Sequence, residues 1–202
     1  MKTILILVRH GETETNIKGK LHLVKDLQIL NETGRVQIQK TAKVLLKYKP
    51  TALYSSKAPR ATKSAEIISK VCKVSAKTIT GLQERNWGDY SGKSWSEITK
   101  LIEKMTPEET YTFVPPNGES WKSFTTRLKK AINQLIARHK GETMVVITHG
   151  GVIRALLPHL LDIPEEERFK YKPVNASITI FEHAHNRFKK INVNDFSHLL
   201  PD

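Results

Sequence analysis

Two histidines in this sequence directly follow apolar segments, and their surroundings point to phosphate chemistry. His10 comes after an apolar run over residues 3–8 and stands beside Arg9, and His149 comes after a second run over residues 144–148. An imidazole can act as a nucleophile or proton carrier near neutral pH, and a guanidinium fork matches the geometry of a phosphate. These residue types therefore predict a site that binds and transforms a phosphoryl group.

The two apolar segments are short and β-branched, which is typical of strands buried on both faces of a mainly parallel sheet. In such sheets, ligands bind beyond the carboxyl ends of the strands. If the two strands are neighbours, His10 and His149 emerge at the same edge and face one pocket. A helix that starts after His149 directs free N–H groups, including that of Gly150, at an anion. We therefore expect an α/β fold, a three-layer sandwich with a mainly parallel central sheet and helices on both faces.

The motif Arg9-His10-Gly11-Glu12-Thr13, followed by Asn16, resembles the signature of the histidine phosphatase superfamily, in its phosphoglycerate-mutase-like branch. The resemblance covers nearly the whole chain and is closest to the small broad-specificity or α-ribazole-type phosphatases. Further matches follow in the order of the family: Ser55-Ser56, Arg60-Ala61, Leu82-Gln83-Glu84, Gly118-Glu119-Ser120, Thr148-His149-Gly150-Gly151, Asn175-Ala176-Ser177 and the closing residues 194–199.

The resemblance implies roles for individual residues. His10 matches the nucleophile that forms a phosphohistidine, and Glu84 matches the general acid that protonates the leaving oxygen. The full set implied is catalytic His10, Glu84 and His149, and phosphate-binding Arg9, Asn16, Arg60 and Gly150. Since phosphoryl transfer depends mainly on positioning and charge stabilisation, the cations of this set require neither a metal nor a cofactor.

Considered by themselves, several of these residues have a plain structural alternative. Asn16 is typical of a turn, and Glu84 is typical of a solvated loop. Arg60 falls in the first turn of a predicted helix and off its apolar stripe, where a cation opposes the helix dipole unless an anion neutralises it. Arg154 lies in the helix after the second histidine, and we expect it to be structural or solvated.

The reaction type depends on the insertion over residues 94–118, which we expect to form a lid over the strand ends. Mutases of the family carry a pair of arginines there, whereas the segment from Ser94 to Gly118 contains none. We therefore expect a metal-independent phosphomonoesterase. The alternatives are a cofactor-dependent phosphoglycerate mutase and a catalytically inactive phospho-ligand-binding protein. Five aromatic residues are candidates for substrate contacts near the lid: Trp87, Tyr90, Trp95, Tyr111 and Phe113.

The composition of the chain limits the number of domains and the kinds of partner that we expect. A chain of 202 residues with 39% hydrophobic residues is expected to fold as a single domain over 1–202. The net charge of +13 comes from dispersed lysines, and the aromatic content is 7%, so we expect a small phosphorylated metabolite as partner and no nucleic acid. The apolar runs are too short for a membrane span, and a lone Cys72 excludes an internal disulfide. We expect a cytoplasmic protein without a membrane partner, and a homodimer is left open.

The secondary-structure pattern also makes detailed predictions. A polar loop is expected over residues 13–28, and a helix is expected to begin after the N-cap Asn31. Short strands are expected over residues 52–54 and 74–80, a lid helix over 98–105, and a closing hairpin that turns near Asn186. Residues 106–109 are expected to form a turn, and Cys72 to be buried as a small hydrophobe.

Overall fold

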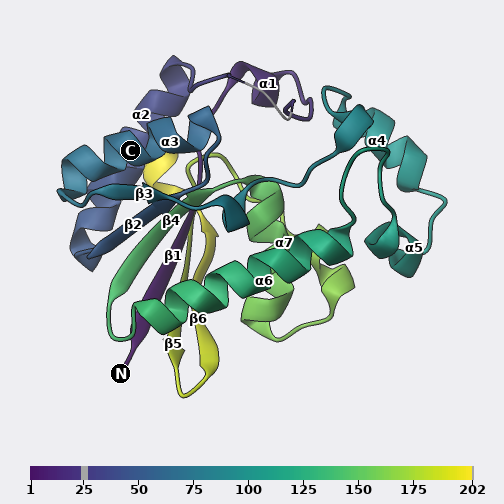
Figure 1. The fold of residues 1–202 in the computed structure, drawn as a ribbon. Coiled ribbons are helices and arrows are strands. Elements are labelled where there is room, and N and C mark those ends of the chain that lie inside the picture. Colours follow the sequence, from purple (N-terminus) through teal and green to yellow (C-terminus); the bar gives the residue numbers. More distant parts are fainter. Residues whose placement is uncertain (24–26, 202) are drawn as a thin grey trace.

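The computed structural model describes residues 1–23 and 27–201, and in these ranges six strands form one mixed sheet (Figure 1). The strands are β1 (Thr3–Arg9), β2 (Ala52–Ser55), β3 (Ala76–Thr78), β4 (Thr143–Thr148), β5 (Ile178–Ala184) and β6 (Arg187–Asp195). Their order in the sheet is β3-β2-β4-β1-β5-β6. The first four of this order run parallel, and β5 and β6 add an antiparallel hairpin.

The neighbours β1 and β4 form the centre of the sheet. Their register pairs Ile4 with Thr143 and, at the other end, Arg9 with Thr148. Because both strands end at the same level, His10 and His149 leave the sheet side by side, as the sequence predicts. Residues 5–8 of β1 are completely buried, which explains their continuous run of aliphatic side chains.

Helices cover both faces of the sheet (Figure 1). On one face, α2 (Glu32–Leu45) and α3 (Pro59–Cys72) pack over a core that includes Ile38 and Ile68. On the other, α6 (Trp121–Arg138) and α7 (Gly150–Leu161) pack over a core that includes Phe124 and Leu156. The predicted α/β class, a mainly parallel sheet between helices, is confirmed.

The remaining helices lie beside the carboxyl ends of the strands, and in Figure 1 α4 and α5 extend past the end of α6. They are α1 (Glu14–Ile17), α4 (Trp95–Ile102) and α5 (Pro107–Thr112), with 3-10 turns at Leu46–Tyr48, Thr80–Leu82, Gly88–Tyr90, Glu165–Lys170 and Ser197–Leu199. Backbone hydrogen bonds connect the start of the insertion over 94–118 to the segment after α1. Leu21 N–H donates to the Lys93 carbonyl at 2.8 Å, and Trp95 N–H donates to the Gly19 carbonyl at 3.0 Å.

Some predicted elements were wrong in position or type. The lid helix begins at Trp95 instead of residue 98, because Ser94 caps it in a capping box with Glu97. Residues 106–109 begin α5 instead of forming a turn, because Thr106 caps that helix and Pro107 occupies its first position. The loop predicted over 13–28 contains the one-turn helix α1, and residues 24–26 of that prediction lie outside the described residues.

Two smaller predictions also differ. The strand predicted over 74–80 is limited to Ala76–Thr78, all exposed at the edge of the sheet. Cys72 is only half-buried, because it ends α3 at the margin of the core. Within the described part of the chain, none of the helices has the length and apolar character that a bilayer crossing requires.

Candidate active site

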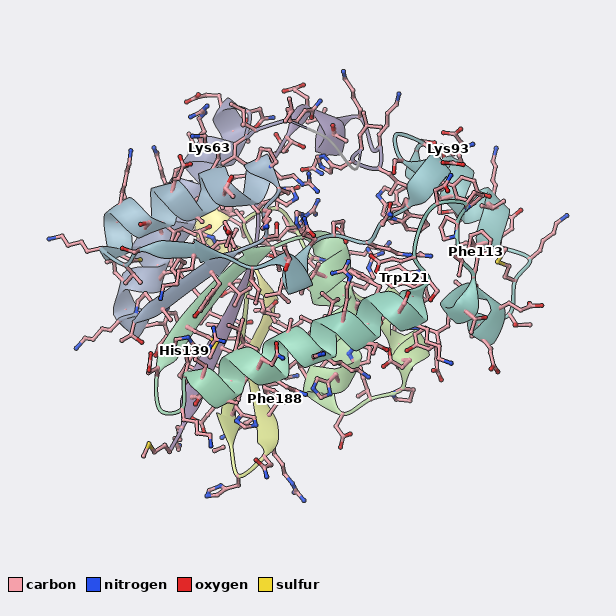
Figure 2. The ribbon with its side chains drawn as sticks, in the orientation of Figure 1. Lys63, Lys93, Phe113, Trp121, His139 and Phe188 are labelled. Atoms are coloured by element: carbon pink, nitrogen blue, oxygen red, sulfur yellow. The ribbon has the colours of Figure 1, made fainter. Side chains whose placement is uncertain are left out.

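A cavity of about 1000 Å³ lies at the carboxyl ends of β1 and β4. The structure brings every residue of the predicted site to its wall: Arg9, His10, Asn16, Arg60, Glu84, His149 and Gly150. These residues come from the ends of β1 and β4, from α1, from the starts of α3 and α7, and from the loop that carries Glu84. Trp121, the first residue of α6, also lines the cavity (Figure 2).

His10 is held in one orientation by its own backbone neighbour. Its Nδ1 lies 2.8 Å from the Gly11 carbonyl oxygen, which can only accept a hydrogen bond. Nδ1 therefore carries the proton, and the lone pair is left on Nε2. Burial, followed by the charges of Arg60, His149 and Arg9, holds the pKa of His10 well below its ordinary value of 6.5. The ring is thus neutral and nucleophilic at neutral pH.

Two arginines reach the site from different elements. Arg9 is anchored by a 2.7 Å hydrogen bond from Nη1 to the Pro173 carbonyl, and burial lowers its pKa to about 10, so it stays charged at neutral pH. Its buried Nε has no acceptor among the described residues. A Cβ on Gly150 would lie 3.3 Å from this Nε, so the glycine gives the guanidinium its space. Arg60, in the first turn of α3, is only 4% exposed, unlike a solvated arginine.

His149 presents a proton to the cavity. Ser56 Oγ lies 2.7 Å from His149 Nε2 and accepts a hydrogen bond from the Ala58 N–H at 3.4 Å. The Ser56 hydroxyl hydrogen is therefore free to donate to Nε2, and the ring proton is left on Nδ1. This Nδ1 is buried and has no partner in the described part of the chain. The His149 and His10 rings are 5.3 Å apart, close enough for one small ligand to contact both.

Asn16 has a structural role and also lines the cavity. Its side-chain oxygen accepts from the Thr13 N–H at 3.2 Å, which completes the capping box of α1. The same oxygen accepts from Asn175 Nδ2 at 3.0 Å, and the Asn16 amide nitrogen lies 3.3 Å from His22 Nε2. The turn asparagine and the pocket residue are thus the same group. His22 and Asn175 are neighbours that sequence reasoning had not assigned to the site.

Glu84 is fixed by two backbone donors. Its Oε1 accepts from the Arg85 N–H at 2.9 Å, and its Oε2 accepts from the Gly151 N–H at 3.0 Å, at the start of α7. A Cβ on residue 151 would lie 2.2 Å from Oε1, so this close approach requires glycine. The carboxylate faces the cavity that the phosphate-site residues also line.

The loop that carries Glu84 is clamped by Arg127 of α6. Arg127 donates to the carbonyls of Gly81, Gln83 and Glu84 at 3.0 to 3.1 Å. It also pairs through Nη2 with Glu119 at 2.6 Å, and Glu119 in turn accepts from the Asn86 N–H at 2.9 Å. These bonds hold the loop that connects the 3-10 turns at Thr80–Leu82 and Gly88–Tyr90. The match at Gly118-Glu119-Ser120 was the only sequence signal for them.

Arg154, which was predicted to be structural or solvated, donates to the Tyr171 carbonyl and also lines the cavity. It follows Gly150 by four positions, and the helical spacing places both on one face of α7. That spacing was the available signal. Of the five aromatic candidates, only Trp87 and Trp95 line the cavity. The others pack elsewhere, since Tyr90 stacks on Phe113 and Tyr111 lies against Arg168.

Comparisons with known proteins agree with this geometry. Residues 5–196 match the histidine phosphatase superfamily, branch 1. The chain belongs to this family. It is 32% identical over 209 residues to the metal-independent phosphoserine phosphatase of Arabidopsis thaliana, covering 98% of this chain and 83% of the relative. It is also 35% identical over 183 residues to phosphoglycerate mutase-like protein 4 of the same plant, covering 88% of this chain and 78% of the relative.

Solved structures of this superfamily share the fold over the whole chain. Phosphoserine phosphatase from Entamoeba histolytica superposes with a TM-score of 0.88 at 26% identity, covering 98% of this chain and 100% of that one. Bacillus stearothermophilus YhfR superposes with a TM-score of 0.87 at 28% identity, with the same coverage of both chains. The predicted family, the histidine phosphatase fold and the phosphomonoesterase class are confirmed by these likenesses.

Proposed function

We propose that this histidine phosphatase hydrolyses the phosphomonoester of a small metabolite through a phosphohistidine at His10, without a metal or cofactor. One observation carries the proposal. The unprotonated Nε2 of a neutral, buried imidazole shares its pocket with Arg9, Arg60 and the Nδ1 proton of His149. These groups supply the charge that the equatorial phosphoryl oxygens require.

The two half-reactions use the same residues. In the first, His10 Nε2 attacks phosphorus, the P–O ester bond breaks, and Glu84 gives a proton to the departing alcohol oxygen. In the second, a water attacks the phosphohistidine and gives its proton to Glu84 while the P–N bond breaks. Inorganic phosphate leaves, and both residues return to their starting states. Glu84 is suited to this role because two backbone donors fix its carboxylate in the cavity.

We further propose that residues 1–202 form one domain in which the insertion over 94–118 acts as a lid and selects the substrate. The contact between this segment and the cavity is Trp95, which lines the wall. A cytoplasmic location and a homodimeric assembly stay predictions.

A mutase is the second candidate, because relatives of this chain include phosphoglycerate mutases. The 2,3-bisphosphoglycerate-dependent enzyme of Bartonella bacilliformis is 32% identical over 181 residues, covering 83% of this chain and 85% of the relative. The absence of arginine between Ser94 and Gly118 supports hydrolysis instead. The insertion therefore lacks the pair of arginines with which mutases of the family hold their substrate, so it does not retain the intermediate, and water completes the reaction.

The test is a turnover screen of phosphomonoesters in EDTA beside an isomerisation assay. We expect release of inorganic phosphate in chelator, and an acid-labile, base-stable phosphoenzyme trapped by rapid quench with labelled substrate. Interconversion of 2- and 3-phosphoglycerate should be slow even when the bisphosphate primes the enzyme. Efficient primed isomerisation with little phosphate release would favour the mutase, and turnover that EDTA abolishes would overturn the proposed chemistry.

A further inference from the structure

Arg154 is held at the edge of the cavity by two contacts. Its Nε donates to the Tyr171 carbonyl at 3.0 Å, and its guanidinium carbon lies 5.8 Å from the ring centroid of Trp95. One contact comes from the segment after α7 and the other from the first residue of α4. A long side chain that is fixed near its end by two elements loses little further freedom when it binds a ligand.

The outer nitrogens of this guanidinium have no protein acceptor within the ranges that the structure describes, 1–23 and 27–201, although the side chain lines the cavity. Two other arginines line the same part of the cavity, but their donors are bonded to protein acceptors. Arg127 donates to Glu119 and three carbonyls, and Arg85 donates to the carbonyls of Glu119 and Phe113. Arg154 is therefore the arginine of this end whose donors are left for a ligand.

The place of Arg154 relative to Glu84 indicates which part of a ligand it meets. The Glu84 carboxylate raises the pKa of Arg154, against a larger lowering by burial, so the two groups are electrostatic neighbours. They do not form an ion pair in the described structure, because Glu84 is bonded to the backbone of Arg85 and Gly151. Besides the larger effect of burial, the charge of Arg154 also lowers the pKa of Arg9, so Arg154 lies near the proposed acid and near a proposed phosphate ligand. We place it on the leaving-group side because its two anchors, Trp95 and the Tyr171 carbonyl, belong to segments that hold none of the predicted phosphate ligands. The half-buried cation lacks a paired anion there.

We propose that Arg154 binds a second anionic group, carried by the alcohol portion of the substrate a few atoms from the ester oxygen. The inference rests on the proposed function. A planar guanidinium with two free nitrogens binds a carboxylate or a phosphate in a bidentate manner, and both ligands share this chemistry. Lys20 and Lys57 also line the cavity, but both are exposed and lack comparable anchors, so they provide a diffuse positive field.

The experiment compares matched esters that differ in one anionic group. Carboxylate pairs are 3-phosphoglycerate with glycerol 3-phosphate, and phosphoserine with phosphoethanolamine. The phosphate pair is propane-1,3-diol bisphosphate with propyl phosphate. In the wild-type enzyme, kcat/KM should be about 10- to 100-fold higher for the ester that carries the second anionic group, in at least one kind of pair. This is the range of a hydrogen bond to a charged group. The kind that shows the preference identifies the group.

Arg154→Gln should remove most of that preference. For the ester of each pair that lacks the second anionic group, kcat/KM should stay within about threefold of wild type. Arg154→Lys should retain part of it, because a point charge replaces the fork. Arg138→Gln, at the exposed end of α6, is the matched control and should change neither ester. Binding of each ester to the inactive His10→Ala protein, measured by calorimetry, should show the same loss for Arg154→Gln.

Several results would overturn the inference. The first is an equal kcat/KM for both members of every pair in the wild type. The second is an equal decrease of kcat/KM for both members in Arg154→Gln, which would mean that Arg154 only supports Glu84 or the lid. The two proposals fail separately. If no ester yields phosphate or a phosphoenzyme, the proposed function fails, whereas a normal phosphoenzyme without an Arg154-dependent preference overturns this inference alone.

Discussion

The two ends of the cavity are built differently. At the proposed phosphate end, His10, Arg60 and His149 are 2%, 4% and 0% exposed, and they lie directly after a strand or in the first turn of a helix. At the proposed leaving-group end, Glu84 lies on a loop held by Arg127, and Trp95 of the insertion over 94–118 is 42% exposed.

Under the proposed function, this contrast follows from the part of the substrate that each end would bind. A phosphoryl group is the same in every substrate, so rigid and buried groups can be built to match it. The alcohol portion differs between substrates, and loops and insertions on a fixed scaffold are where such differences are accommodated. Changes at the phosphate end should therefore slow every ester alike, whereas changes at the other end should alter the ratio between esters.

The largest effect is expected at the phosphate end. His10→Ala removes the nucleophile, and turnover of alkyl and nitrophenyl phosphates should fall by about 10⁴-fold or more for both. Phosphoenzyme trapping should disappear in the same variant. If His10→Ala retains most of its activity, or loses activity for only one ester, the proposal that the phosphate end acts on every ester alike is wrong.

Glu84→Gln tests whether the leaving-group end alters the ratio between esters. It keeps the size of the side chain but removes the transferable proton, which an alkoxide leaving group needs and a nitrophenolate hardly needs. General acid assistance contributes about 10²–10⁴-fold, so phosphoenzyme formation from alkyl phosphates should slow by that factor and from the nitrophenyl ester far less. Single-turnover rapid quench isolates this step from hydrolysis. Equal slowing for both esters would make Glu84 a positioning residue, with another group as the acid.

A glycine pair offers a finer test. Gly151→Ala places a Cβ 2.2 Å from Glu84 Oε1 and must displace the carboxylate, whereas Gly150→Ala meets Arg9 at 3.3 Å. A displacement of about 1 Å can cost about 10²-fold, so Gly151→Ala should slow alkyl esters by up to that factor and spare the nitrophenyl ester.

Gly150→Ala is the matched comparison for the other end. It should slow both esters by the same smaller factor, because it crowds a phosphate ligand instead of the acid. Steady-state and single-turnover rates of both variants with both esters provide the measurement. An unchanged ratio between the esters in Gly151→Ala would show that the Glu84 position does not control protonation.

The smallest expected effect concerns titration. Arg60 is, after burial, the main cause of the lowered pKa of His10, so Arg60→Gln should raise that pKa toward its ordinary value of 6.5. NMR titration of labelled histidine in the ligand-free protein measures it directly, and Arg138→Gln, on the exposed end of α6, is the control. An unchanged His10 pKa in Arg60→Gln would show that the charge of Arg60 does not lower it.

The sign of the linked stability effect follows from the same shift. Below about pH 6.5 the unfolded chain binds a proton at this histidine that the folded chain resists, so wild-type stability falls as the pH drops from 6.5 through the lowered pKa. Arg60→Gln should reduce this loss, and urea unfolding at a series of pH values would show it.

The sequence alone determined the centre of this protein. The apolar runs that end at His10 and His149 are local patterns typical of strands buried on both faces of a mainly parallel sheet. If such strands are neighbours, both histidines lie at one edge, and the pairing of β1 with β4 meets that condition. Arg60 was also accessible to reasoning, because a cation in the first turn of a helix conflicts with the dipole unless it meets an anion.

Only the tertiary structure decided the leaving-group end. Whether Arg154 faces solvent or the cavity depends on where α7, the Tyr171 carbonyl and Trp95 meet, and these lie far apart in the sequence. The clamp of Arg127 on the Glu84 loop likewise joins residues more than 40 positions apart. Local patterns specify how a segment buries its apolar face, but polar contacts between distant segments form only when the packing of the whole chain brings them together.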